Sequence, residues 1–475
     1  MTTNSQPAAR VVSLRQQIQT RLEGGMQRIG EARRPTLVSV TLPLPVHDPL
    51  ALFARGATLF PHRFFWAHPQ SRVAFAGLGV AWTAASEGAK RFADAAESWR
   101  ALCTDALLDG PAGALGTGPL ALGGFRFDPE RSRDPLWEGF PDGLLTLPRI
   151  LLACDGDACH LTVNTVLRPG EQPPEDLPVL LRRIGTLLAG ARHTLAPTVA
   201  TDPLRVTGGM APAEWSTMLR GAIEQMAHDH MEKVVLARSS LVAGPHPFDP
   251  ATAMARLRAA YPNCFCFALE RGPRCFLGAS PERLVSLRNG MIAASCLAGS
   301  IARGATPEED AQLGQALLGS PKDRVEHAIV LRELLADLSG AAVGLSAPDA
   351  PVLMRLPNVQ HLFTPVTGRA APGVSVLDLV ARLHPTPAVG GSPRGDALGL
   401  IRASEPTERG WYAAPLGWID AHGEGEFAVA LRSGLLHGAT ATLYAGCGIV
   451  AASDPEREYA ESQLKLRPML SALGK

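Results

Sequence analysis

A lysine opens an apolar run of the sequence, where a charged side chain needs a physical reason. Residues 233–239 read KVVLARS, a pattern that predicts a buried strand beginning at Lys233. The chain has 45 basic residues but only five lysines, so most of its cations are arginines. Arginine stays charged at any ordinary pH, whereas a buried lysine can release its proton and act as a base. Lys233 is therefore either a solvent-exposed residue at a strand edge or a general base.

Two predicted helices each carry a pair of acids on one face. The segment SPKDRVEHAIVLRELLADL begins at residue 320 with a serine cap and a proline in the first turn. Its Asp323 and Glu326 are three positions apart and so lie on the same helix face. The segment SDPEREYAESQLKLRPML begins at residue 453 and repeats this spacing with Glu458 and Glu461, followed one turn later by Lys465.

The four carboxylates of these helices could converge on a hard cation. Mg²⁺ takes oxygen ligands, usually a few carboxylates with several waters, which this arrangement suits. The alternative is that acids near helix N-termini only favour the helix dipole. A di-iron site is not expected, because His327 directly follows Glu326 and the Glu-x-x-His spacing is absent.

Three further segments contain residues that could have a binding or catalytic role. Glu282 lies in LGASPERLVSL, between two predicted strands. The segment LHPTPAVGGSPRGDA is too broken for a strand and too apolar for a flexible linker, so it connects elements or shapes a pocket; its His384 is expected to be a structural hydrogen-bonding residue. In EFAVALRSG, strand alternation predicts Ala428, Ala430 and Arg432 on one face, where the arginine could meet a carboxylate.

Several elements must position these side chains. EWSTMLRGAIEQMAHDH predicts an amphipathic helix just before the strand of Lys233. The first half instead shows short apolar runs broken by Gly and Pro, which are typical of strands and hairpins. The expected class is mixed α/β, with further helices near 250–260, 321–338, 375–383 and 455–472. The expected divisions are a polar N-terminal helix or tail (1–35), a β-rich half (36–205) and a catalytic half (206–475), which together form one compact body.

Composition excludes several classes of protein. The 475 residues carry 45 acidic and 45 basic side chains, so the chain lacks the basic charge of a nucleic-acid binder or a polybasic membrane protein. The first residues lack the apolar core of a signal peptide, and the sequence has no run of about 18 apolar residues, so neither a secretory signal nor a membrane span is expected. The eight cysteines are scattered without a C-x-x-C pair, which favours reduced thiols over a disulfide framework or a zinc site. We therefore expect a cytoplasmic protein.

In their order along the chain, these segments resemble the chorismate-utilising enzymes, and within them the isochorismate synthase branch of the menaquinone type. That branch shows the lysine of KVVLAR and the whole HPTPAVGG segment. Anthranilate and aminodeoxychorismate synthases typically have glutamine in place of the lysine and take ammonia from a glutaminase partner. Salicylate synthases keep the lysine but usually differ at HPTPA. The other matching segments, within 212–470, are GASPERLVSL, LAGSIARG, KDRVEHAIV, ERGWYAAPLGW, ALRSGLL and AGCGIVAASDPEREYAESQLKLRPML.

The resemblance implies a fold of large stacked β-sheets flanked by helices, and an isomerase that converts chorismate to isochorismate with Mg²⁺. It implies that Lys233 is the base that activates water and that Glu282 is the acid. It implies Glu326 and Glu461 as magnesium ligands, with Asp323 and Glu458 in support. The substrate-binding residues that it implies are Gly299, His384, Ala388, Tyr412, Arg432, Gly446 and Lys465.

Some alternatives remain open at the level of sequence. Ala414 stands where glycine is more usual in the family, and Ser300 where threonine is common. The runner-up activity is salicylate synthase, which would go on to eliminate pyruvate; a non-catalytic relative that binds chorismate is a more distant alternative. No nucleic acid, membrane or glutaminase partner is expected, and the protein is expected to be a monomer or a homodimer.

Overall fold

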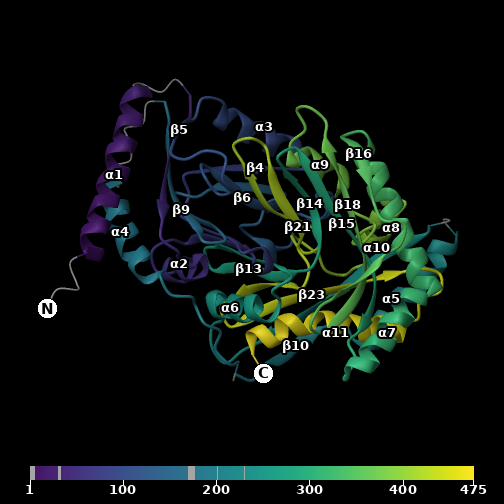
Figure 1. The fold of residues 1–475 in the computed structure, drawn as a ribbon. Helices are drawn as coiled ribbons and strands as arrows, with labels where there is room; N and C mark the ends of the chain where they lie inside the picture. The colour runs from purple at the N-terminus through teal and green to yellow at the C-terminus, as the bar shows by residue number, and fades with distance from the viewer. Residues whose placement is uncertain (1–5, 30–33, 170–176, 201, 229–230, 475) are drawn as a thin grey trace.

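Two large β-sheets form the body of the computed structural model, which describes residues 6–29, 34–169, 177–200, 202–228 and 231–474 (Figure 1). The first sheet has 13 strands. Its order is β10 (Arg205–Gly209), β11 (Lys233–Ala243), β23 (Thr440–Ile449), β22 (Ser433–His437), β13 (Arg274–Ser280), β12 (Phe265–Arg271), β2 (His62–His68), β3 (Val73–Leu78), β8 (Ile150–Asp155), β9 (Ala158–Leu167), β1 (Thr36–Leu44) and β5 (Leu107–Asp109), with β19 (Gly391–Ser392) beside β11.

The second sheet has 10 strands. Its order is β16 (Ala342–Ser346), β18 (Val359–Ala370), β15 (Met291–Ala302), β14 (Arg283–Arg288), β21 (Gly425–Val429), β20 (Pro415–Asp420), β6 (Leu120–Phe125), β7 (Gly143–Leu147) and β4 (Trp82–Ser86), with β17 (Val352–Arg355) beside β18. Each sheet contains strands from both sides of residue 205, so the division expected there falls within continuous sheets. This mixed α/β architecture of large sheets with flanking helices is the fold class expected from the sequence.

Helices cover the outer faces and ends of the sheets. Figure 1 shows α1 and α4 side by side at one end of the molecule, and α5, α7, α8 and α10 at the other. The helices are α1 (Gln6–Ile29), α2 (Pro49–Arg55), α3 (Arg91–Thr104), α4 (Leu177–Gly190), α5 (Pro212–His228), α6 (Pro250–Ala260), α7 (Pro307–Gly319), α8 (Pro321–Ser339), α9 (Val376–Leu383), α10 (Arg394–Ser404) and α11 (Pro455–Leu473). In the described part of the chain, none of them is both long and apolar enough to cross a membrane.

The alternation of side chains along β2 shows where the core lies. Phe64 and Trp66 point into a cluster that contains residues of both sheets, so this cluster fills the space between them. Phe65 and Ala67 point the other way, into a second cluster beneath helices such as α2 and α6. A strand that is buried on both faces reads as a continuous apolar run, as RFFWAH does in the sequence.

The helices expected near 250–260, 321–338, 375–383 and 455–472 are confirmed as α6, α8, α9 and α11, and the amphipathic helix is α5. Five others, α2, α3, α4, α7 and α10, were not expected. In α2, five consecutive residues are buried, which hides the helical period in the sequence. Part of the Pro-rich stretch before α4, residues 170–176, lies outside the described residues.

The expectation of reduced thiols is wrong for one pair of cysteines. Cys154 and Cys159 form a disulfide. They are partners across the hairpin of β8 and β9, with their Cα atoms 4.2 Å apart, so strand pairing alone brings the two sulfurs together. The C-x₄-C spacing straddles a tight turn and gives no motif in the sequence. The remaining six cysteines are free.

Candidate active site

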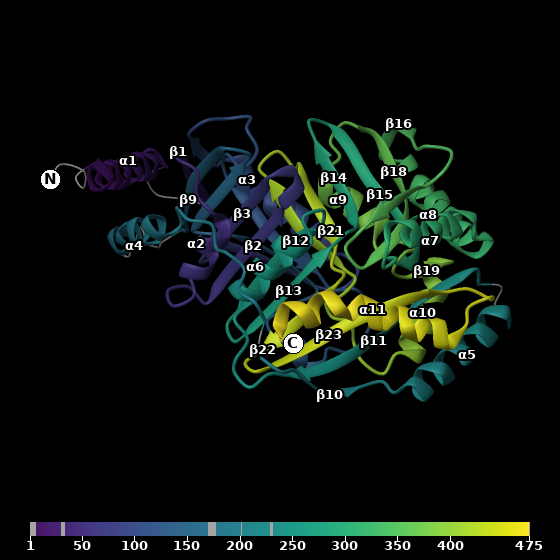
Figure 2. The ribbon, with the colours of Figure 1, turned by 60° about the horizontal axis from the view of Figure 1, so that its bottom comes forward.

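One pocket brings together most of the residues that the sequence singled out. It opens between α8 and α11, and its walls come from β13–β14, β15, β23 and the segments that follow α9 and α10. Figure 2 shows α11 lying across β23 and β11. The expected site residues that line the pocket are Glu282, Gly299, Asp323, Glu326, Ala388, Tyr412, Arg432, Gly446, Glu458, Glu461 and Lys465.

Lys233 is fully buried at the start of β11, so its interpretation as a solvent-exposed edge residue is wrong. The strand edge is covered there, because Lys233 pairs with Ser392 of β19. Its Nζ lies 2.9 Å from Oε1 of Glu326, one of the acids of the pocket. A Cβ atom at Gly448 would lie 2.4 Å from that same oxygen, so only glycine leaves room for the Lys233–Glu326 contact.

Glu282 occupies the connection between β13 and β14 and is 3% exposed. Its backbone carbonyl accepts a hydrogen bond from Val429, which fixes it beside β21. Burial raises the pKa of Glu282 to about 8, even though Lys233 and Arg432 act in the opposite direction. The carboxyl group is therefore mostly protonated at neutral pH, which is the form that a general acid needs.

Three of the five lysines of the chain each contact one glutamate of the pocket. The pairs are Lys233–Glu326 at 2.9 Å, Lys322–Glu458 at 2.7 Å and Lys465–Glu461 at 2.6 Å. The first two join side chains from different elements, so α8 is tied to β11 and to α11. Lys322 was missed in the sequence, although its place beside Asp323 in a chain with so few lysines was a usable signal.

The pKa values of the pocket acids reflect burial and their neighbours. Burial, together with Glu461, raises the pKa of Glu458, and burial likewise raises that of Asp323 despite a hydrogen bond from Ser320. Burial works against the charged form of Glu326 too, but the contact with Lys233 outweighs it and lowers the pKa of that carboxyl. Carboxylates crowded in this way are stabilised by any cation that enters between them.

The donor set fits a hard divalent cation. Carboxylate oxygens of Glu458 and Glu461 and the sulfur of Cys447 lie within 4.8 Å of one another. Cys447 is not suited to Mg²⁺, because burial raises the pKa of its thiol well above the usual value and its Sγ donates to the Glu458 carbonyl oxygen at 3.1 Å. The oxygen ligands remain: four carboxylates on two helices that face one pocket.

The part of the pocket wall around Arg432 is suited to an anion. Arg432 is 8% exposed, and in the described residues no carboxylate forms an ion pair with it. Its Nη2 lies 3.4 Å from Nε2 of His361, whose Nδ1 contacts Ser300 Oγ at 2.8 Å. Burial and Arg432 lower the pKa of His361 well below its usual value, so the neutral ring can accept from the guanidinium. His361 was missed because VQHLFTPV reads as an ordinary strand.

Arg432 lines the pocket, but not through the strand alternation that the sequence predicted. β21 ends at Val429 and β22 begins at Ser433, so strand alternation does not extend to residue 432. Arg432 instead has a φ of 50°, and Ala413, which also lines the pocket, has a φ of 60°. Non-glycine residues adopt this left-handed region at a cost and often do so at functional sites.

Arg409, which the sequence did not single out, holds one wall of the pocket together. Its guanidinium donates to Glu405, to the carbonyl oxygen of Val389 at 2.8 Å and to that of Val235 at 2.7 Å. It thereby fixes the loop that contains Ala388 against the strand of Lys233. One arginine among many gave no signal in the sequence.

Two expected site residues do not line the pocket. Lys233 contacts one of its acids, Glu326, whereas His384 lies elsewhere. Its Nε2 contacts the carbonyl oxygen of Phe127 at 3.0 Å, and its ring packs edge-on against Phe92 and Phe127. Burial lowers its pKa well below the usual value, so the ring is neutral. This environment matches the structural hydrogen-bonding role and not contact with a substrate.

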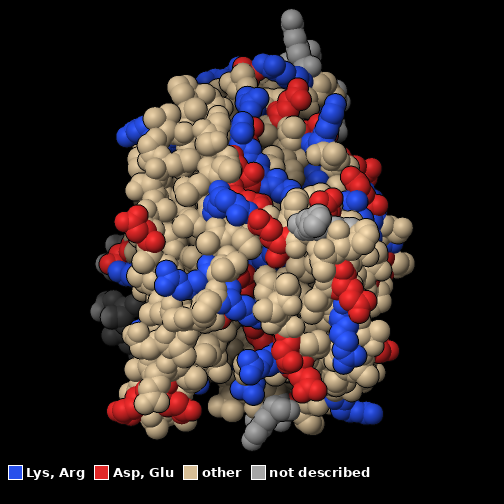
Figure 3. Space-filling model, turned by 90° about the vertical axis from the view of Figure 1, so that its right-hand side faces the viewer, with Lys and Arg blue, Asp and Glu red and all other residues tan. Residues whose placement is uncertain are grey.

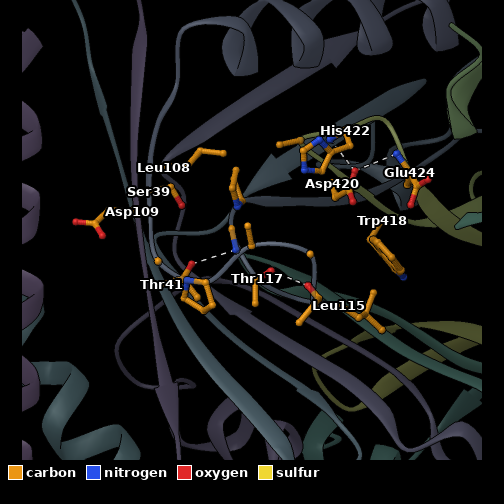
Figure 4. Close-up of a pocket in the computed structure, with 18 of the residues that line it drawn as sticks. Ser39, Thr41, Leu108, Asp109, Leu115, Thr117, Trp418, Asp420, His422 and Glu424 are labelled. Carbon is orange, nitrogen blue, oxygen red and sulfur yellow. Dashed lines mark hydrogen bonds between the residues drawn. The ribbon is translucent and has the colours of Figure 1, made fainter. Parts of the chain in front are cut away.

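A second cavity lies between β1, the glycine-rich loop after β5 and the turn between β20 and β21 (Figure 4). Two of its three acids accept hydrogen bonds from backbone N–H groups, and the third, Asp109, forms an ion pair with Arg21 of α1 at 3.1 Å. Asp420 accepts hydrogen bonds from the backbone N–H groups of His422 and Glu424, and Glu424 accepts from those of Asn289 and Gly290. None of the expected site residues lines this cavity.

Among the described residues, the surface beside α5, α7, α8 and α10 shows no large patch of a single charge. Figure 3 shows Lys and Arg side chains interspersed with Asp and Glu along a band on this face. Ion pairs such as Arg332–Glu232 account for part of this mixing. The face therefore lacks the continuous positive charge of a nucleic-acid interface.

Comparisons with known proteins agree with this geometry. A family model described as chorismate binding enzyme matches residues 24–474. The chain is 37% identical to isochorismate synthase MenF of Bacillus subtilis, over 94% of this chain and 96% of that protein. It is 40% identical to the salicylate biosynthesis isochorismate synthase of Pseudomonas aeruginosa, over 95% and 94%.

The fold is also that of a solved relative. The structure of MenF, the menaquinone-specific isochorismate synthase from Escherichia coli, aligns with a TM-score of 0.76 and 26% identity, covering 96% of this chain and 99% of that one. Sequence and structure thus agree over nearly the whole length of the protein. The chain belongs to the family of chorismate-binding enzymes.

Proposed function

We propose that the protein is an isochorismate synthase, which converts chorismate to isochorismate by adding water at C2 while the C4 hydroxyl group leaves. The observation that carries the proposal is the pairing of a fully buried Lys233 with an acid of the pocket, in the same pocket as a mostly protonated Glu282. A protein that only bound chorismate would need an anion site but neither a base nor an acid.

The reaction needs both groups. Water is a poor nucleophile and hydroxide a poor leaving group, so a base must take a proton from the attacking water and an acid must protonate the departing hydroxyl. In the proposal Lys233 removes the proton as water attacks C2, the ring double bonds shift, and Glu282 gives its proton to the C4 hydroxyl, which leaves as water. Each contribution is typically worth about 10²–10⁴-fold in rate.

The substrate is a dianion, and the pocket offers groups for both of its carboxylates. In the proposal the guanidinium of Arg432 donates two parallel hydrogen bonds to the enolpyruvyl carboxylate, and His361 orients this guanidinium. Lys465 lies nearby with its Nζ on the Gly446 carbonyl oxygen at 2.9 Å. Burial works against the charge of Lys465, but Glu461 outweighs it and raises the pKa of this group, so it stays cationic.

Magnesium is the cofactor in this proposal. Glu326 and Glu461 would hold it, with Asp323 and Glu458 in support, since these four carboxylates face the pocket. When bound, Mg²⁺ supplies a template for the ring carboxylate and a Lewis acid that withdraws electron density.

The names of the relatives point to different pathways for the product, so experiment must decide which pathway this protein serves. The B. subtilis and E. coli relatives are MenF proteins, whereas the P. aeruginosa relative is named for salicylate biosynthesis. We propose the menaquinone branch, no glutaminase partner and a cytoplasmic location.

The product spectrum tests the proposal. Purified protein is incubated with chorismate and Mg²⁺, with and without ammonium, and the products are separated by chromatography. The expected result is isochorismate in balance with chorismate, without pyruvate. Salicylate with pyruvate would assign the protein as a salicylate synthase, and an aminated product would overturn the role of Lys233.

A further inference from the structure

Two of the buried arginines in the described residues have no carboxylate paired with them. Arg63, Arg126 and Arg409 are each paired with a carboxylate. Arg91 lies near Asp142 and Asp128 and donates to backbone carbonyls. The remaining two, Arg432 and Arg238, form no ion pair within the described residues, and each lines a cavity. Burying a cation without a counter-charge is costly, so such a position calls for an explanation.

Arg432 is explained by the substrate pocket, but Arg238 is not. Arg238 is 4% exposed and lies on β11, on the opposite face from Lys233 because the two are an odd number of residues apart. Its Nε donates to Ser462 Oγ at 2.8 Å, and its guanidinium lies 4.5 Å from the ring centre of Tyr459. Its Nη2 is buried and has no hydrogen-bond partner.

Arg238 lines a cavity between α5 and α10, next to the C-terminal end of β10. The cavity has a volume of about 990 Å³. Figure 1 shows these two helices at the same end of the molecule. Met210, Met218, Leu400 and Pro406 make its walls largely apolar.

The polar groups around the cavity restrict the charge that it can take. Glu214 accepts a hydrogen bond from the N–H of Ala211 at 2.8 Å and so occupies the N-terminus of α5. Ser239 and Thr407 contact each other through their hydroxyl oxygens at 3.4 Å. Arg238 and Glu214 are the charged residues that line the cavity, so its wall has no surplus positive charge to hold a doubly charged phosphate.

We propose that this cavity is a second ligand site, distinct from the chorismate pocket, that binds a monocarboxylate with an apolar body. The carboxylate pairs with the guanidinium of Arg238, and the apolar body fills the space between Met218 and Leu400. Carboxylate and guanidinium match in geometry, and the apolar walls add burial of the ligand's carbon skeleton.

Binding of hexanoate and of its neutral analogue hexanamide tests the site. Both are added to the purified full-length protein, and dissociation constants are measured by ligand-observed NMR. Hexanoate is expected to bind at least tenfold more tightly than hexanamide, and inorganic phosphate alone is expected not to bind. Equal affinity for hexanoate and hexanamide, or phosphate binding as tight as hexanoate, would overturn the proposal.

Three variants locate the binding. Arg238→Gln removes the charge, and Gly221→Leu fills the cavity from α5, where a Cβ would meet nothing within 4 Å. Both are expected to weaken hexanoate binding at least tenfold. Gly221→Leu keeps the test decisive if Arg238→Gln does not fold. Arg432→Met, in the chorismate pocket, is expected to leave hexanoate binding unchanged; loss of binding in that variant alone would place the ligand in the chorismate pocket and refute the second site.

Discussion

The pocket between α8 and α11 and the cavity of Figure 4 both collect acidic side chains, but most of these acids have different kinds of partner. In the pocket, Glu326 and Glu458 contact lysines that come from other elements of the fold. In the cavity, Asp420 and Glu424 contact backbone N–H groups of nearby turns. Acids that accept hydrogen bonds from backbone N–H groups stabilise turns. Acids that are paired with lysines of other elements can instead exchange the lysine for a ligand. We therefore expect substitutions in the pocket to reduce turnover, and those in the cavity to reduce stability alone.

The largest effect is expected at Lys233. Lys233→Met and Lys233→Arg should each reduce kcat by roughly 10²–10⁴-fold, since neither side chain can accept a proton from water. Circular dichroism serves as the control for folding. A Lys233→Arg enzyme within tenfold of the wild-type rate would remove the lysine from the mechanism.

Glu282 should give the next largest effect and a change in pH dependence. With a pKa of about 8, Glu282 loses its proton as the pH rises through that value, so kcat should fall on the alkaline side. Glu282→Gln should lower kcat by roughly 10²-fold or more and abolish this alkaline limb. An unchanged alkaline limb in the variant would assign it to another group.

The same carboxyl group links pH to folding. Its pKa is raised from an ordinary 4.5 to about 8 in the folded state, so the folded protein binds the extra proton. The contribution of Glu282 to stability is therefore full below about pH 4.5 and is lost as the pH rises towards 8. Urea unfolding at several pH values should show a smaller decrease for Glu282→Gln than for the wild type.

Glu326 and Glu461 should affect the metal more than the fold. Glu326→Gln and Glu461→Gln are each expected to weaken Mg²⁺ binding by about 10–100-fold, the range found even for residues that only support metal ligands. Isothermal titration with Mg²⁺ measures this directly, and Glu424→Gln is the matched control from the other cavity. Wild-type magnesium titrations in both pocket variants would show that the metal assignment is wrong.

The smallest effect on activity is expected at Asp420. Asp420→Ala removes the acceptor for the N–H groups of His422 and Glu424, so the melting temperature should fall by roughly 1–3 °C. The rate of chorismate turnover should stay within about twofold of the wild type. A large loss of turnover with an unchanged melting temperature would reverse the comparison between the two cavities.

The sequence was most informative where chemistry depends on residue type within a short motif. The acid pairs of α8 and α11 were predictable because capping residues and helical spacing determine which face they occupy. Lys233 stood out as a rare lysine at the start of an apolar run, whereas a role for Glu282 came only from the resemblance. His361 and Arg409 were not, because their roles arise from contacts between elements that are far apart in sequence. The helix α2 and the Cys154–Cys159 disulfide were missed because burial on nearly all sides and strand pairing leave no periodic or spaced motif.

The pairing of β2 with β12 has a consequence for synthesis of the protein. Trp66 has its partner in Phe267, about 200 residues later in the chain. Ribosomes add roughly 5–20 residues per second, so the edge of β2 that β12 later covers stays unpaired for roughly 10–40 s. That edge belongs to the apolar run RFFWAH, which can pair with other chains. Recovery of native protein should therefore depend on how well the nascent first half is shielded until its second half has been translated.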